Sequence, residues 1–429
     1  MPIAPDVKRK IIGVTVLFII FAILGSLLVL ERPQNSDLTA YEVQAQKIFE
    51  EAKSQFEGIR NVTLPPNIKL SVYTKQQAVD RWGKDPSGVD TVSVLRQENI
   101  YKSLFLIAEN DSLGGVTAEW TTGWMAASVG NEIYVIYENF WPWDMPDAIA
   151  TLIHELTHVW QSGLPASTSH DTDRAHSALV EGDAAYMADY YRAQYNNRIN
   201  SEDSEYNNRL PVFIDSLRLN SVQPSVPDAV TELNWFSYIK GKTFVAALID
   251  DGGWDRLNHC YIPAHTPSTT TQIIHPDKYF AGKTAKPTLT PTPVDDNWTR
   301  IPSRYGFASD SYGEYFIYVM LSRWLNDSQA QQVASGWSGD SFTYYEKGSD
   351  FMFTWNITWN SVQNASEFNQ TFRDMLNLAQ ANLQGIDTWF TNGKYLTLTW
   401  DPNAESTLIV CSTNQAATEA SFFNYQSQS

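Results

Sequence analysis

An uninterrupted apolar run near the N-terminus constrains this chain more than any other feature. Residues 11–30 carry no charged side chain, and the basic residues Lys8, Arg9 and Lys10 come directly before them. At about 1.5 Å per residue, a helix of this length crosses the roughly 30 Å hydrocarbon layer of a membrane. Because basic flanks stay in the cytoplasm, we expect a single-pass anchor in the cell membrane, with residues 1–10 inside and the C-terminal part outside the cytoplasm.

A cleaved signal peptide is the alternative interpretation of the same run. The apolar core of a signal peptide is usually shorter and ends in a cleavage site of small residues. The end of the run, "LLVLERPQ", contains no such site. The sequence therefore favours an uncleaved signal anchor.

The rest of the chain has the composition of a folded body. Of its 429 residues, 43% are hydrophobic and 13% are aromatic, which is enough for a large core. The net charge of −18 disfavours nucleic acid as a partner, because basic side chains must neutralise a phosphate backbone. Cys260 and Cys411 are too few for a cysteine zinc finger, and they form either one disulfide or two separate thiols.

Hydrophobic periodicity predicts a mixture of helices and strands after the anchor. Residues 36–58 have helical spacing and form either a stalk or a helix packed on the body. Residues 68–74 alternate like a strand, and Gly130-Asn131 predicts a hairpin whose second strand covers 132–137. Further helices are expected at 75–83, 89–108, 172–195, 230–251, 313–326 and 366–382, late strands at 395–401 and 406–412, and an extended, exposed Pro/Thr-rich connection at 282–297.

The stretch "DAIATLIHELTHVWQSG", residues 147–163, carries the clearest chemical signal. Asp144 and Pro146 are suited to begin a helix here, and Gly163 is suited to end it. On this helix His154 and His158 lie one turn apart on one face, and the apolar stripe lies on the opposite face. The alternative is an ordinary helix whose polar face happens to carry His-Glu-His.

Two imidazoles one helical turn apart can both bind one Zn²⁺ at about 2.0–2.1 Å. Glu155, between them in sequence, projects toward a zinc-bound water rather than toward the metal. Zinc lowers the pKa of such a water toward about 7, and a carboxylate beside it acts as the general base. Because a structural site has no use for Glu155, the motif predicts a catalytic zinc centre.

A catalytic zinc needs a third protein ligand and one open position. We expect Glu181, on the next predicted helix, to supply this ligand, since Gly182 beside it permits two helices to approach closely. His170 and His176 are the alternatives. The longer pattern H-E-x-x-H-x-x-G-x-x-H is excluded, because Gln161 stands where that pattern requires Gly.

The motif together with Glu181 resembles the thermolysin-like zinc peptidases, the gluzincins. The resemblance implies that His154, His158 and Glu181 are the metal ligands and that Glu155 is the general base. The family places an Asp four residues after the ligand Glu, where it orients a histidine. Here that position holds Ala185, so another group must take this role.

Several supporting roles are assigned as hypotheses. Asp183 and Asp189 are the candidates for orienting a histidine. Tyr238 and His275 are the candidates for the donor that stabilises the oxyanion, although packing or a turn would explain each of them equally well. The strand at 132–137 is expected either to expose an edge to which an extended peptide adds, or to be a plain interior strand.

Longer stretches are similar to a group of mostly uncharacterised, predicted metallopeptidase-like proteins of archaea and bacteria. They are "YIKGKTFVAALIDDGGW", "PSTTTQIIHPDKYF", "YGEYFIYVMLSRWL" and "ASGWSGDSFTYYE". The resemblance implies an α+β fold with a zincin-like catalytic half, made of a small sheet and the HExxH helix, followed by a mainly helical half. The corresponding domains are a juxtamembrane helix or stalk (31–58), a catalytic subdomain (59–196), and a mainly helical subdomain with a polar C-terminal tail (197–429).

These inferences predict a membrane-anchored zinc peptidase that hydrolyses a peptide or protein substrate outside the cytoplasm. Two alternatives remain open at this point. The first is a catalytically inactive zincin-like ectodomain that serves binding or adhesion. The second is a metal-dependent hydrolase of non-peptide substrates, which the motif alone does not exclude.

Overall fold

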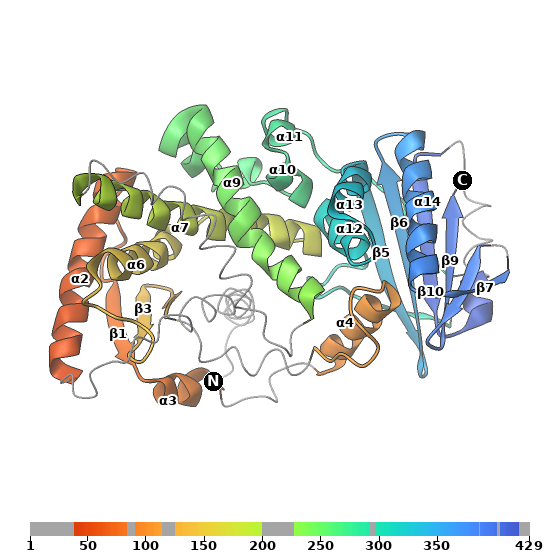
Figure 1. Ribbon diagram of the computed structural model, residues 1–429, viewed down its shortest axis with the longest axis horizontal. Helices are drawn as coiled ribbons and strands as arrows, with labels where there is room; N and C mark the ends of the chain where they lie inside the picture. Colours follow the sequence, from red (N-terminus) through yellow and green to blue (C-terminus); the bar gives the residue numbers. More distant parts are fainter. Residues whose placement is uncertain are drawn as a thin grey trace. The chain divides into compact units, whose positions relative to one another are not determined.

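The computed structural model describes residues 38–83, 91–113, 125–199, 227–291, 293, 297–385, 387–400 and 404–419 (Figure 1). Within these ranges the protein is a mixed α+β structure, which confirms the predicted fold class in its coarse form. The predicted anchor at 11–30 lies outside the described residues. None of the helices in the described ranges combines the length and the apolar character that a membrane crossing requires.

The contacts between Cα atoms divide the chain into two compact units. Unit 1 comprises Met1–Thr91, Ser112–Leu164 and Ser177–His265, and unit 2 comprises Val92–Asp111, Pro165–His176 and Thr266–Ser429. Residues of the predicted catalytic subdomain, 59–196, therefore occur in both units. The reason is that α4 (Thr91–Ser103) and the first turns of α7 (His170–Ile199) are assigned with the C-terminal part of the chain.

The first helix of unit 1, α2 (Leu38–Arg60), belongs to the hydrophobic core and is not a free stalk. It runs beside α6 (Met145–Trp160) in Figure 1, and the Tyr41 hydroxyl donates to the Phe140 carbonyl at 2.7 Å. The helical spacing seen in the sequence thus marks a packed face. The core side chains of α2 are Tyr41, Ala45, Ile48, Phe49, Ala52 and Phe56.

Unit 1 contains a three-stranded sheet in the order β1-β3-β2. β1 (Lys69–Tyr73) is parallel to β3 (Glu132–Ile136), and β2 (Ala126–Val129) forms the predicted hairpin with β3 through Gly130, whose φ is 61°. Of the two possibilities for 132–137, the structure has the interior strand, because β1 and β2 pair with β3 on both sides. β3 is a buried interior strand, and β2 is the edge strand next to α6.

Two of the remaining helices of unit 1, α7 and α9, pack with close backbones. These remaining helices are α3 (Lys75–Ala78) with its π-helical continuation Val79–Gly83, α6, α7, α9 (Asp228–His259) and the short η4 (Pro263–His265). A Cβ added to Gly182 of α7 would lie 2.2 Å from the Gly241 carbonyl carbon of α9. Gly182 therefore permits a close approach, as predicted, but the partner helix is α9 and not α6.

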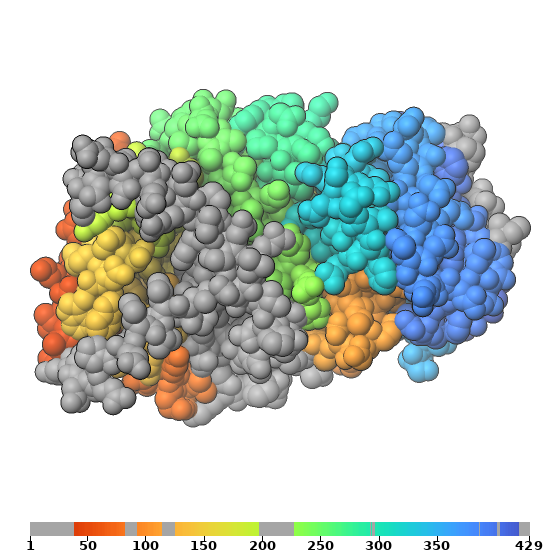
Figure 2. Space-filling model, viewed as in Figure 1, coloured from red at the N-terminus to blue at the C-terminus, as the bar shows by residue number. Residues whose placement is uncertain are grey.

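Unit 2 contains a seven-stranded antiparallel sheet in the order β4-β5-β6-β10-β9-β8-β7. α14 (Val362–Leu378) lies against β6, β9 and β10, and in Figure 2 the segments from α12 to β10, in cyan and blue, form a continuous surface. The strands are β4 (Thr299–Ile301), β5 (Trp337–Lys347), β6 (Asp350–Trp359), β7 (Asn382–Gly385), β8 (Thr388–Thr391), β9 (Lys394–Trp400) and β10 (Ser406–Ser412). The other helices are α4, α10 (Thr270–Ile274), α11 (Pro276–Phe280), α12 (Gly313–Ser322) and α13 (Asp327–Ala334).

The prediction of a mainly helical second half is therefore wrong. The late strands at 395–401 and 406–412 were predicted and do pair as β9 and β10, but β5 and β6 were not recognised. Both β5 and β6 are buried along nearly their whole length, on both faces of the sheet. Such strands lack the alternation of apolar and polar residues that marks a half-exposed strand.

The Pro/Thr-rich connection predicted at 282–297 is extended and largely exposed over its described residues 283–291, and it is also bound to the sheet. The Lys286 amide donates to the Ser338 carbonyl at 2.7 Å, and Asn356 Nδ2 donates to the Leu289 carbonyl at 3.0 Å. Gly339 accommodates this strap, since a Cβ there would lie 2.3 Å from the Lys286 carbonyl oxygen. The connection thus covers part of β5 and β6.

Candidate metal centre

Helix α6 forms where the sequence predicts it and presents a buried face. Asp144 is the N-cap residue, although its side chain makes no capping hydrogen bond, and Pro146 lies in the first turn. Proline fits there because the first amides of a helix have no partner within the helix. The helix ends at Trp160, and Gln161 turns the chain into an extended conformation with φ −61° and ψ 123°.

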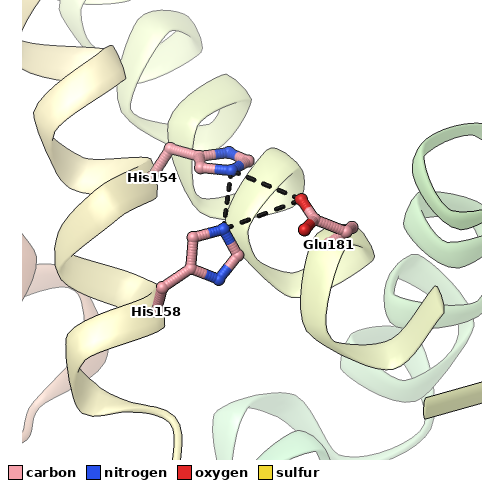
Figure 3. A group of neighbouring side chains, drawn as sticks. All are labelled: His154, His158 and Glu181. Atoms are coloured by element: carbon pink, nitrogen blue, oxygen red, sulfur yellow. Dashed lines mark hydrogen bonds and ion pairs between the residues drawn. The ribbon is translucent and has the colours of Figure 1, made fainter. Parts of the chain in front are cut away.

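The two histidines of α6 converge on Glu181 of α7 (Figure 3). The Nε2 atoms of His154 and His158 lie 2.9 Å apart, and Oε2 of Glu181 lies 3.5 Å from the first and 3.6 Å from the second. All three side chains are largely buried, with 3%, 11% and 3% of each side chain exposed. One ligand atom from each residue therefore faces a common point.

The size of this triangle fits a metal ion. A point equidistant from the three atoms lies about 1.9 Å from each, close to the roughly 2.0–2.2 Å of zinc bonds to imidazole nitrogen and carboxylate oxygen. Oε2 of Glu181 is buried and has no hydrogen-bond partner among the described residues. Because buried acceptors are almost always satisfied, this oxygen fits a role as a ligand, and the three residues could hold a metal ion.

Burial sets the protonation states that metal binding requires. It lowers the pKa of His154 to about 3, and it also lowers the pKa of His158, which the nearby Glu181 carboxylate raises in part. Burial raises the pKa of Glu181, whereas His158 and the Tyr238 hydroxyl beside it lower this pKa. Both imidazoles are thus neutral, as metal ligands must be.

Hydrogen bonds on the far side of each ring leave the Nε2 atoms free for a metal. Nδ1 of His158 lies 3.0 Å from Oε1 of Gln161, and the main chain at Ala184 accepts a hydrogen bond from His154. A neutral imidazole carries one proton, so a proton on Nδ1 leaves a lone pair on Nε2. Both rings therefore present an acceptor toward Glu181.

Glu155 is buried beside the ligands, with 2% of its surface exposed. Burial raises its pKa to about 8, while a hydrogen bond with Ser128 of β2 lowers the pKa and the charge of Glu181 raises it. The carboxylate thus lies between the metal ligands and the edge strand of the small sheet. This is the place from which it can exchange a proton with a group bound at the centre.

The other predicted site residues fall into two groups. Tyr238, on α9, lies beside Glu181 as the prediction requires, and burial raises its pKa well above 10. His275 belongs to unit 2, where its Nε2 lies 2.8 Å from Oε1 of Glu314. Its predicted role at the metal centre stays a prediction.

The alternative ligands have other partners. Nδ1 of His170 lies 2.6 Å from Oδ2 of Asp310, and Nδ1 of His176 lies 3.3 Å from Oγ of Ser167. Neither histidine belongs to the metal-binding group found among the described residues. Both cysteines are buried free thiols, so of the two possibilities for Cys260 and Cys411 the structure has separate thiols.

Of the two candidates for orienting a histidine, Asp183 is linked to His158 through one side chain, whereas the charge of Asp189 raises the pKa of His154. Asp189 pairs with Lys242 at 2.8 Å and with Arg192 at 3.2 Å. Asp183 contacts Gln161, which in turn contacts His158. Gln161 was considered in the sequence only for the pattern that it excludes, and no local signal identified it as a neighbour of the metal ligand.

Two comparisons with known proteins gave a match. One match lies outside the candidate metal centre, and the other is a weak structural similarity. Residues 302–420 match a domain of unknown function (DUF8575), which lies within unit 2 and contains none of the metal-binding residues. Among solved structures, the chain is similar to one titled "Crystal structure of a putative hydrolase with a novel fold from Chloroflexus aurantiacus". The sequence identity is 14% and the TM-score 0.36, over 61% of this chain and 96% of that chain. A search of curated proteins gave no significant match.

Proposed function

We propose that the protein is a membrane-anchored zinc peptidase of the gluzincin type. The observation that carries the proposal is the convergence of His154, His158 and Glu181 on one point, with the buried Glu155 beside them. Three protein ligands leave one position open, as in catalytic rather than structural zinc sites. A buried acid next to the ligands adds the group that proton transfer needs.

Zinc is the metal that the donor set favours. Two imidazole nitrogens and one carboxylate oxygen are typical of catalytic zinc, whereas calcium and magnesium prefer oxygen ligands alone. When bound, zinc acidifies water and polarises a carbonyl group. The buried surroundings of His154 and Glu181 exclude competing solvent from the three ligand atoms.

The chain's own residues supply the rest of the proposed chemistry. A dication held by the three ligands would lower the pKa of Glu155 from its raised value, so that the carboxylate could accept a proton and return it to the leaving amine, and Ser128 holds this carboxylate in place. Tyr238 remains protonated, because burial raises its pKa, and its hydroxyl is therefore a donor for the oxyanion that develops on the substrate. His275 is kept as a second candidate donor.

The substrate is proposed to be an extended peptide. β2 is an edge strand of the small sheet, and Ser128 on this strand contacts Glu155. A peptide that adds to the edge by main-chain hydrogen bonds would bring its scissile bond beside the base. The apolar run at 11–30 is proposed to anchor the enzyme in the cell membrane, with both units outside the cytoplasm.

Metal content and proteolysis of the purified full-length chain test this proposal. We expect about one zinc per chain, cleavage of an unstructured protein, and a loss of cleavage of about 10²–10⁴-fold in Glu155→Gln with zinc retained. Unchanged cleavage in this variant would reject the mechanism. Zinc without cleavage in the native chain would favour the binding or adhesion alternative, and cleavage only of non-peptide esters or amides would favour the other hydrolase class.

A further inference from the structure

We propose that Gln161, Asp183 and Arg60 form a relay that positions the metal ligand His158, in place of the Asp that the gluzincin pattern provides. The proposal rests on the proposed zinc site. In that pattern the orienting residue lies four positions after the ligand Glu, and here Ala185 occupies this position. Gln161 and Arg60 come from outside the two motif helices, one just after α6 and one at the end of α2.

The orientation of the Gln161 amide is fixed by its neighbours. Its Nε2 donates to the Val180 carbonyl at 2.9 Å, to Oδ2 of Asp183 at 3.2 Å and to the Tyr261 hydroxyl at 2.9 Å. The opposite orientation would direct the amide oxygen at a carbonyl and a carboxylate, both of which only accept. Oε1 of Gln161 therefore faces His158, and Nδ1 of His158 is the atom that carries the proton.

Asp183 holds Gln161 in this orientation. It is fully buried, and its Oδ2 accepts hydrogen bonds from the Tyr261 hydroxyl at 2.6 Å and from Nη2 of Arg60 at 3.0 Å. Asp183 therefore acts on His158 indirectly. Its carboxylate accepts from Gln161 Nε2, and Gln161 Oε1 accepts from Nδ1 of His158. Hydrogen bonds in such a buried chain strengthen one another, because the surrounding medium screens them little.

Arg60 anchors the relay in the core. Its guanidinium pairs with Asp183 with both side chains fully buried, and Nη2 donates to Oδ1 of Asn258 at 2.9 Å. It also lies between the rings of Trp160, 4.5 Å away, and Trp254, 5.0 Å away. A charge held on all sides in this way cannot shift without breaking several contacts, so the relay resists rotation of the His158 ring.

Substitutions at Gln161 test the relay by zinc affinity, measured in the full-length chain by competition with a chelator. Gln161→Met keeps the length of the side chain and removes the acceptor for His158 Nδ1. We expect zinc to bind about 10–100-fold more weakly, which is typical when the group that orients a histidine ligand is lost. The visible spectrum of the Co²⁺-loaded chain should shift as well, because the ring is free to rotate.

Gln272→Met provides the matched control. Gln272 is a buried glutamine whose Nε2 donates to the Lys283 carbonyl at 2.8 Å, and it contacts neither His158 nor a residue of the relay, so this variant should lower thermal stability and leave zinc affinity within about threefold of native. Tyr261→Phe, which removes the hydroxyl between Gln161 and Asp183, should weaken zinc binding several-fold and keeps the relay testable if Gln161→Met does not fold. Native affinity in Gln161→Met, or an equal loss in Gln272→Met, would overturn the relay. A native chain that binds no zinc would instead overturn the proposed function itself.

Discussion

Buried carboxylates beside histidines occur in both units, but they are satisfied in different ways. In unit 2, Asp310 accepts from Nδ1 of His170 at 2.6 Å and from its amide at 2.8 Å. Glu314 is likewise shared between His275, at 2.8 Å, and the Thr271 hydroxyl, at 2.8 Å. Each carboxylate oxygen of these two acids therefore has a direct hydrogen-bond partner.

In unit 1, the carboxylate and the imidazoles face each other without pairing. Oε2 of Glu181 stands 3.5–3.6 Å from the two Nε2 atoms and has no hydrogen-bond partner among the described residues. Leaving a buried charged acceptor unsatisfied is costly. A histidine next to an acid is therefore no sign of a metal site by itself, whereas in unit 1 three possible ligand atoms lie close enough together to hold one ion.

Removing the buried cation Arg60 should give the largest effect on stability. Arg60→Met keeps a side chain between the two tryptophan rings but leaves Asp183 as an unpaired buried charge. We expect the free energy of unfolding to fall by about 3–5 kcal/mol in denaturant titrations. Lys286→Met breaks an ion pair that is nearly half exposed, with Glu405, and should cost at most about 1 kcal/mol. If the free energy of unfolding fell equally in both variants, the buried pair Arg60–Asp183 would contribute no more to stability than the exposed pair Lys286–Glu405.

Substitutions of Glu181 in unit 1 and of Glu314 in unit 2 should have different effects on zinc binding. Glu181→Gln is expected to weaken zinc binding by at least about 100-fold, or roughly 2.7 kcal/mol, because a neutral amide replaces an anionic ligand. Glu314→Gln, in the satisfied cluster, should bind zinc as the native chain does. Equilibrium dialysis of both variants against buffered zinc measures the difference. Full zinc affinity in Glu181→Gln would remove Glu181 from the site.

The convergence of His154, His158 and Glu181 was predictable from the sequence because most of its geometry is local. One helical turn separates His154 from His158, and the periodicity of the next helix placed Glu181 on an element able to return to them. The supporting network was not predictable. Arg60 meets Asp183 across 123 positions and Asn258 across 198, and a single sequence carries no signal for such pairs.

The same distinction applies to the fold: features set by neighbouring residues were predictable, and features set by residues far apart in the sequence were not. Helical spacing gave α2, α6 and α7 closely, whereas the choice between an edge strand and an interior strand at 132–137 stayed open, because it depends on the pairing of β3 with β1, far earlier in the sequence. The contact of Gly182 with Gly241 was also beyond reach, since a glycine shows that something comes close but not which element it is.

The smallest effect is expected from Asp310 in unit 2, and its pH dependence is specific. Burial raises the pKa of Asp310. The charge of His170 and the hydrogen bonds from His170 and Ser311 lower this pKa by more than burial raises it, so the net value lies below the ordinary 3.8. A lowered pKa in the folded state means that the stabilisation is present above pH 3.8 and is lost as the pH falls through the folded value. Asp310→Asn should therefore cost about 1–2 kcal/mol near pH 6, with a difference from native that shrinks below pH 3.8.

Urea titrations of native chain and variant between about pH 6 and pH 3 measure this difference. Thr290→Val, which removes a hydroxyl bonded to the Ser341 hydroxyl and no titratable group, is the control and should show a difference from native that does not change with pH. A difference for Asp310→Asn that stays constant across the range would mean that the carboxylate charge contributes nothing through His170. Asp310 would then be stabilised only by hydrogen bonds that do not depend on its charge. Its contrast with Glu181 would rest only on the shorter distance to its histidine, 2.6 Å against 3.5–3.6 Å.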